Sequence, residues 1–148
     1  MDSISWRISG NPYNLWTFIT RSEEIFTMRK SNGHDVPLEI PADHNGTDIH
    51  DRHSAFETFA SKSKNDQQYC WSHIICDAKE LEEFYGEECG KIKRTLQTIF
   101  DEAKEYHGHG TMEDVEKLHR ILTFLLDSHY EHARCRKFVK YLLTRKKE

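Results

Sequence analysis

The pattern of apolar and polar positions divides the chain into a strand-rich first half and a helical second half. In the first half, short segments rich in aromatic and β-branched residues lie between turn residues, which predicts strands. The expected strands cover residues 6–8, 13–20, 25–28, 47–50 and 68–71. Short helices are expected over residues 36–40 and 54–60, and another begins near residue 72. The predicted order is β-β-β-α-β-α-β-α, and tight turns should make the first three strands an antiparallel meander.

From about residue 72 onward, apolar residues recur at the spacing of a helical face. The first long stripe consists of Ile92, Leu96, Ile99, Phe100 and Ala103. The segment 108–110, Gly-His-Gly, should end that helix, and Thr111 with Asp114 resembles a capping box for the next one. The second stripe consists of Val115, Leu118, Leu122, Leu125 and Leu126, and a last helix is expected over residues 134–145. We expect the stripes to pack in a core, with Trp6, Trp16 and Trp71 as further core anchors.

Composition is typical of a soluble globular domain, with 148 residues, 36% hydrophobic and 31% charged. No apolar run approaches the roughly 20 residues that span a bilayer, and no signal-peptide pattern follows Met1. Four cysteines are too few for the disulfide scaffold of a small secreted protein. We therefore expect a reducing, cytoplasmic setting and no membrane partner.

The basic residues gather at the end of the chain. Residues 134–148 carry seven Lys or Arg and one Glu, a balance of +6, whereas the residues before them sum to −10. Such a segment can contact nucleic-acid phosphates. The candidate DNA-binding residues are Arg134, Arg136, Lys137, Lys140, Arg145, Lys146 and Lys147. The alternative is a solvated helix end whose cations oppose the helix dipole.

Two aspartates lie where short strands deliver a carboxylate. Asp2 opens the segment 2–7, and Asp51 follows the expected strand 47–50. Paired carboxylates of this kind hold the metal ions of many nucleases and transposases. The alternatives are a solvated residue near the chain end for Asp2 and a helix cap for Asp51.

A second candidate metal site has the residue types of a zinc centre. Cys70, His73 and Cys76 are spaced three residues apart, and Cys89, His107 or His109 would supply a fourth ligand. No second closely spaced pair of ligands is evident, and free cysteines are more often buried hydrophobes. We therefore disfavour zinc, although a helical zinc protein stays an alternative reading.

Three stretches resemble the central part of a DDE-type transposase of the insertion sequence 66 family. Asp2-Ser-Ile-Ser-Trp6-Arg7-Ile-Ser-Gly10, followed by Tyr13-Asn-Leu-Trp16-Thr-Phe18, is similar to the family's Asp-Glu-Thr-x-Trp-Arg-Val-x-Gly and Tyr-x-Leu-Trp-x-Phe. Asp51-Arg-His-Ser54-Ala55-Phe56 resembles Ser-Asp-Phe-Tyr-Ser-Ala-Tyr. The segment 68–81, with Cys70, His73 and Asp77, resembles Gln-x-Cys-x-x-His-Leu-x-Arg-Asp-x-Lys-x-Leu.

The resemblance implies an α/β fold with a ribonuclease-H-like mixed sheet over residues 1–85 and a helical region over residues 86–148. In that fold the first and fourth strands are neighbours, so Asp2 and Asp51 should converge as catalytic metal ligands. His73 and Asp77 are expected as neighbours of the site. The implied activity is Mg²⁺- or Mn²⁺-dependent cleavage and transfer of DNA strands at the ends of an insertion element.

The family's third carboxylate lies in a segment resembling Asn-Asn-x-x-Glu-Arg, which this sequence does not contain. We therefore expect a truncated transposase core that is inactive alone. The alternative is a non-catalytic regulatory module that binds DNA, an intact transposase or a second copy of itself.

Overall fold

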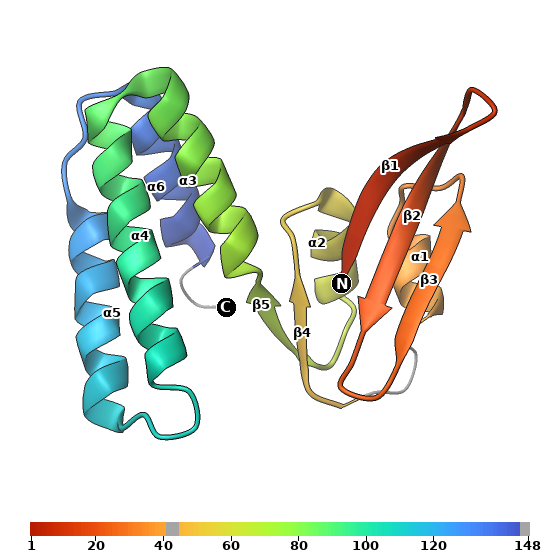
Figure 1. Ribbon diagram of the computed structural model, residues 1–148, viewed down its shortest axis with the longest axis horizontal. Helices are drawn as coiled ribbons and strands as arrows, with labels where there is room; N and C mark the ends of the chain where they lie inside the picture. Colours follow the sequence, from red (N-terminus) through yellow and green to blue (C-terminus); the bar gives the residue numbers. More distant parts are fainter. Residues whose placement is uncertain (41–44, 146–148) are drawn as a thin grey trace. The chain divides into compact units, whose positions relative to one another are not determined.

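The computed structural model describes residues 1–40 and 45–145, without the Arg145 side chain, and divides them into two units (Figure 1). The first unit covers Met1–Cys70, and the second begins at Trp71. The first contains β1 (Asp2–Ile8), β2 (Asn11–Ile19), β3 (Glu24–Arg29), α1 (Asp35–Glu39), β4 (Thr47–His50), α2 (Ser54–Ala60) and β5 (Asp66–Tyr69). The second contains α3 (Trp71–Tyr85), α4 (Glu87–Glu105), α5 (Met112–Asp127) and α6 (Ala133–Arg145). The predicted order β-β-β-α-β-α-β-α is confirmed. The predicted domain boundary between residues 85 and 86 stays a prediction.

Strands β1, β2 and β3 form an antiparallel sheet in that order, as predicted. Trp16 of the central strand lies opposite Ser3 on β1 and Thr27 on β3. The tight turn between β1 and β2 places Ser9 and Gly10 at φ angles of 49° and 80°. Glycine adopts this left-handed region without a steric penalty, which explains its place in the turn.

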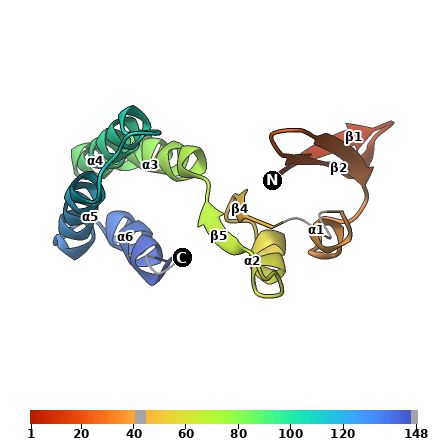
Figure 2. The same ribbon diagram turned by 90° about the horizontal axis from the view of Figure 1, so that it is seen from below.

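The core of the first unit lies on one face of this sheet, beside α1 and α2 (Figure 2). Its buried side chains are Trp16, Phe18, Val36, Ala55 and Phe56. Trp16 is 0% exposed, which confirms one predicted anchor. Trp6 is 56% exposed, so its prediction as an anchor is wrong. Trp6 pairs with Tyr13, and alternation along β2 turns these side chains away from the face that carries Trp16.

Strands β4 and β5 pair in parallel as a separate two-stranded sheet. His50 lies opposite Tyr69, and Ile49 lies opposite Gln68. The start of the first sheet contacts this pair, since the Met1 amino group donates a hydrogen bond of 2.6 Å to the Ile49 carbonyl. The fold class is therefore mixed α/β, as expected. A single ribonuclease-H-like sheet is not confirmed.

The helical unit begins at Trp71, within one residue of the predicted start near residue 72. Trp71, expected at the end of a strand and in the core, instead begins α3, where it is half-buried and stacks on Phe100 with 6.5 Å between ring centroids. Ion pairs join α3 to α4 (Lys93 to Glu82, 3.6 Å) and α4 to α5 (Lys117 to Glu102, 2.6 Å). Among the described residues, no helix combines the length and apolar character needed to cross a membrane.

Local signals in the helical unit were predicted correctly, and its buried faces only in part. Thr111 and Asp114 form the predicted capping box, with hydrogen bonds of 3.3 Å and 2.8 Å between each side chain and the other residue's backbone N–H. Along the predicted stripes, the buried residues are Ile92, Leu96, Ile99, Leu125 and Leu126. Val115 is 55% exposed, so the predicted core stripe of α5 is wrong at its start.

Candidate metal centre

The first unit brings the carboxylates of Asp2 and Asp51 together. Asp2 is the first residue of β1, and Asp51 directly follows β4. Their carboxylate oxygens lie within 4.8 Å of one another although the two strands belong to different sheets. The family resemblance implied this proximity. Their role as metal ligands stays a prediction.

Backbone N–H groups hold both carboxylates, which are half-buried. The Ser3 N–H donates to Asp2 Oδ1 at 2.7 Å, and the His53 N–H donates to Asp51 Oδ1 at 2.8 Å. The N-cap of α2 is His53, whose Nδ1 accepts a hydrogen bond from the Ala55 N–H at 3.3 Å. Asp51 therefore supports the capping residue His53. It is not itself the N-cap of α2, which was the alternative role considered for it.

A buried polar network lies beside Asp51, and sequence reasoning missed it. Asp48 and His50 are 3% and 1% exposed, on the inward side of β4. The Gln67 amide donates to Asp48 Oδ2 at 2.9 Å, so its Oε1 faces His50 Nε2, 3.2 Å away. The other ring nitrogen, His50 Nδ1, lies 2.6 Å from the Asp51 carbonyl. Asp48 and His50 alternate with Ile49 along the strand, so they share one face. This alternation was the sequence signal that could have indicated the network.

This network fixes the backbone at Asp51 from inside the unit. The His50 ring also stacks on Phe56 of the core, with 5.5 Å between ring centroids. Buried polar groups that hydrogen-bond to one another favour one arrangement, because breaking a bond leaves a buried group unpaired. Buried hydrogen bonds therefore hold the backbone at Asp51.

Charge at the centre favours a cation. Burial lowers the pKa of the Met1 amino group, and the nearby carboxylates of Asp2, Asp48 and Asp51 act in the opposite direction. Carboxylate oxygens are the ligands that hard divalent cations such as Mg²⁺ and Mn²⁺ prefer. Asp2 and Asp51 fit such an ion. The Asp48 carboxylate instead accepts hydrogen bonds from the Gln67 amide and from Ser63 Oγ, the latter at 3.1 Å.

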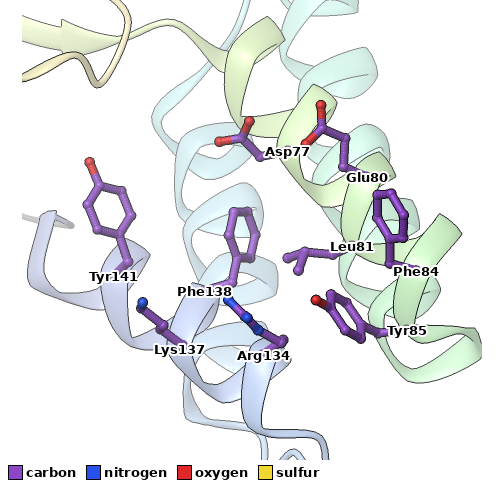
Figure 3. Close-up of a pocket in the computed structure, with 9 residues that line it drawn as sticks. All are labelled: Asp77, Glu80, Leu81, Phe84, Tyr85, Arg134, Lys137, Phe138 and Tyr141. Atoms are coloured by element: carbon purple, nitrogen blue, oxygen red, sulfur yellow. The ribbon is translucent and has the colours of Figure 1, made fainter.

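The other predicted neighbours of the site, His73 and Asp77, belong to α3 in the second unit. Their proximity to the carboxylates stays a prediction. Within the second unit, Asp77 and Glu80 line a groove of 390 Å³ between α3 and α6 (Figure 3). The groove also contains Arg134 and Lys137, two of the predicted DNA-binding residues.

The predicted DNA-binding residues are in different situations. The Arg134 guanidinium lies 5.9 Å from the centroid of the Tyr85 ring. Arg136 donates to the carbonyl oxygens of Tyr130, at 3.0 Å, and Glu131. Lys140 is exposed. The Arg145 side chain, Lys146 and Lys147 lie outside the described residues, and DNA binding by this segment stays a prediction.

The cysteines separate into two free thiols and one bridge. Cys70 is half-buried and Cys76 exposed, and both are free. Cys89 and Cys135 form a disulfide across 46 residues, which the sequence pattern did not predict.

A mixed α/β unit that presents two adjacent carboxylates, followed by a helical unit, is the combination expected of the DDE-type transposase class. A sequence model described as the transposase IS66 family matches residues 6–148, and the chain belongs to this family. The match includes Asp51 and begins after Asp2, so the case for Asp2 rests on its position beside Asp51. No curated protein and no solved structure matches the chain.

Proposed function

We propose that this chain carries part of a transposase catalytic core, which cuts and joins DNA strands at the ends of an insertion element. The observation that supports this most directly is the proximity of the Asp2 and Asp51 carboxylates, within 4.8 Å, in a chain of the IS66 family. We further propose that residues 1–85 are related to the ribonuclease-H-like core and that residues 86–148 form its helical region.

Asp2 and Asp51 would hold one or two Mg²⁺ or Mn²⁺ ions through their oxygens. Bound metal would supply activation of water or a DNA 3′-hydroxyl and stabilisation of the leaving oxygen. The protein's own contribution is positioning. The network of Asp48, His50 and Gln67 fixes the backbone of Asp51, and the contact between Met1 and Ile49 holds β1 beside β4.

On this proposal, Asp2 and Asp51 would be two of the three carboxylates of the family's centre. The third would lie in an Asn-Asn-x-x-Glu-Arg segment, which is absent from this sequence. Two carboxylates leave much of the octahedral shell of Mg²⁺ to water. We therefore expect this polypeptide to bind metal weakly and to leave DNA uncut.

A structure determined with Mn²⁺ tests the proposal. Manganese bound between Asp2 and Asp51 would support it, and loss of the metal in Asp51→Asn would assign the ligand. Protein without metal at this place, at Mn²⁺ concentrations well above those in cells, would contradict it. Mg²⁺-dependent nicking of duplex DNA, lost in Asp51→Ala, would show that the expectation of inactivity is wrong.

A second candidate is a regulatory module, favoured by the exposed basic residues of α6, two of which, Arg134 and Lys137, line the groove beside α3. Such a module would bind element ends or intact transposase without cutting DNA. Co-purification with an intact transposase would support it. If Arg134, Lys137 and Lys140 contact phosphates, DNA affinity should fall steeply as salt rises. A flat salt response would exclude these residues from DNA binding.

A further inference from the structure

We propose that Cys89, Cys135 and His132 bind Zn²⁺ when the two cysteines are reduced. The sulfur atoms and a nitrogen of the His132 ring lie within 4.8 Å of one another. Thiolates and imidazole are the donors that zinc prefers, and three protein ligands leave a fourth position for water. The inference does not depend on the carboxylate site or on transposition.

Both cysteines lie in the first turn of a helix. Cys89 is the third residue of α4, Cys135 is the third residue of α6, and each is 0% exposed. N–H groups at helix N-termini carry partial positive charge, which favours the thiolate form that ligates metal. His132 directly precedes α6 and is half-buried. The fold thus places Cys135 and His132 beside Cys89, although the sequence shows no ligand pair close to Cys89 along the chain.

Hydrogen bonds that involve no sulfur hold these three residues in place. The Glu88 carboxylate accepts the Glu131 N–H at 2.6 Å and the His132 N–H at 2.8 Å. These two bonds hold the pKa of Glu88 below its usual value. The Tyr130 hydroxyl donates to the Leu125 carbonyl at 2.8 Å. The Glu88 bonds tie the start of α6 to α4 independently of the disulfide, so we expect the three donors to stay close together when it opens.

The backbone geometry suits the bridge and the metal alike. The Cα atoms of Cys89 and Cys135 are 5.8 Å apart. Two thiolates, each about 2.3 Å from a tetrahedral zinc, lie roughly 3.8 Å apart, which side-chain rotation can provide over this Cα separation. His132 Nδ1 accepts the Arg134 N–H at 3.3 Å, a long hydrogen bond. Zinc bound to Nδ1 would use the lone pair that accepts this bond. Zinc bound to Nε2 would leave the ring proton on Nδ1, so the bond is lost in either case.

The bridge and the metal exclude each other. Two molecules of a small thiol reduce the disulfide: the Cys89–Cys135 S–S bond breaks and takes up two electrons and two protons. The sulfurs of the two reductant molecules join in their own disulfide. Zinc then displaces the two thiol protons. In either state α4 and α6 remain cross-linked at this point.

The test measures zinc bound to the whole chain after reduction with a phosphine and dialysis against Zn²⁺. We expect the reduced protein to bind one more zinc per chain than the oxidised protein does. Replacing zinc by Co²⁺ should give thiolate-to-metal charge-transfer absorption. His132→Ala keeps both thiols and should weaken zinc binding by at least about tenfold, the scale of disturbed metal sites. The matched control is His129→Ala, a histidine in the same loop.

The serine variants decide between cysteine pairs. Cys89→Ser should abolish the stoichiometric zinc, and Cys70→Ser with Cys76→Ser should keep it. Reduced wild-type protein that binds no more zinc than Cys89→Ser would overturn the proposal, as would zinc that follows Cys70 and Cys76. If circular dichroism shows that Cys89→Ser does not fold, the zinc affinity of His132→Ala decides the question. Unchanged zinc affinity in that variant then refutes the site.

Discussion

Replacing Asp2 with asparagine should stabilise the first unit when no divalent metal is present. The Asp2 and Asp51 carboxylates lie within 4.8 Å of one another and repel when both are charged. Asparagine has nearly the same shape, and its oxygen can still accept the Ser3 N–H that now donates to Asp2 Oδ1 at 2.7 Å. The substitution therefore removes the charge and keeps the local hydrogen bond.

The expected gain follows from Coulomb's law. Two unit charges about 5 Å apart repel by roughly 1 kcal/mol in water and by about 3 kcal/mol at an effective dielectric constant near 20. Both side chains are half-buried, and Asp2 also attracts the Met1 amino group, which offsets part of the repulsion. We therefore expect a net gain of about 1 kcal/mol or less, which raises Tm by up to about 4–8 °C for a unit of this size.

Thermal unfolding in EDTA, followed by titration with MgCl₂, measures both parts of this reasoning. Wild-type protein should gain stability with Mg²⁺, by about 1.4 kcal/mol at ten times the Kd, and Asp2→Asn should lose this response. Added NaCl should reduce the difference measured in EDTA, because salt screens the repulsion. Asp66→Asn, an exposed carboxylate on β5, is the control and should change neither quantity. A less stable Asp2→Asn that still responds to Mg²⁺ would refute the reasoning.

Three further predictions concern stability. Trp16→Ala should cost about 3–5 kcal/mol in urea unfolding because the indole is fully buried, whereas Trp6→Ala at an exposed position should change little. Equal losses would contradict the assigned core. Hydrogen bonds from the Thr111 backbone and side chain lower the pKa of Asp114, so its stabilisation of α5 is complete above the unfolded-state pKa and is lost as pH falls through the folded-state pKa. In unfolding measured across pH, Asp114→Asn should reduce the loss of stability at acid pH. An unchanged loss in this variant would contradict the prediction. Reducing the Cys89–Cys135 bridge without zinc should lower the free energy of unfolding by up to about 4 kcal/mol, the loop-closure entropy for a separation of 46 residues. A urea midpoint that does not shift on reduction would show that the bridge is absent.

The sequence by itself determined the elements and their order. Strand and helix periodicity, turn residues and the Thr111–Asp114 capping box depend on residues a few positions apart, so they are legible before the chain folds. Asp2 and Asp51 were also proposed from sequence as a pair, because each follows or begins a short strand and lies in a segment that resembles the family's motifs. Their positions along the chain were visible, and the distance between them was not.

Only the tertiary structure decided which faces are buried and which distant residues meet. Trp6 and Trp16 both belong to strands, and the difference in their exposure arises because the core covers one face of the sheet. The hydrogen bonds among Asp48, His50 and Gln67 join β4 to β5, two strands that α2 separates in the sequence. Cys89, His132 and Cys135 are likewise brought together by packing of α4 and α6 across 46 residues. Such contacts depend on loop closure and on the summed burial of many side chains, which no short segment of sequence encodes.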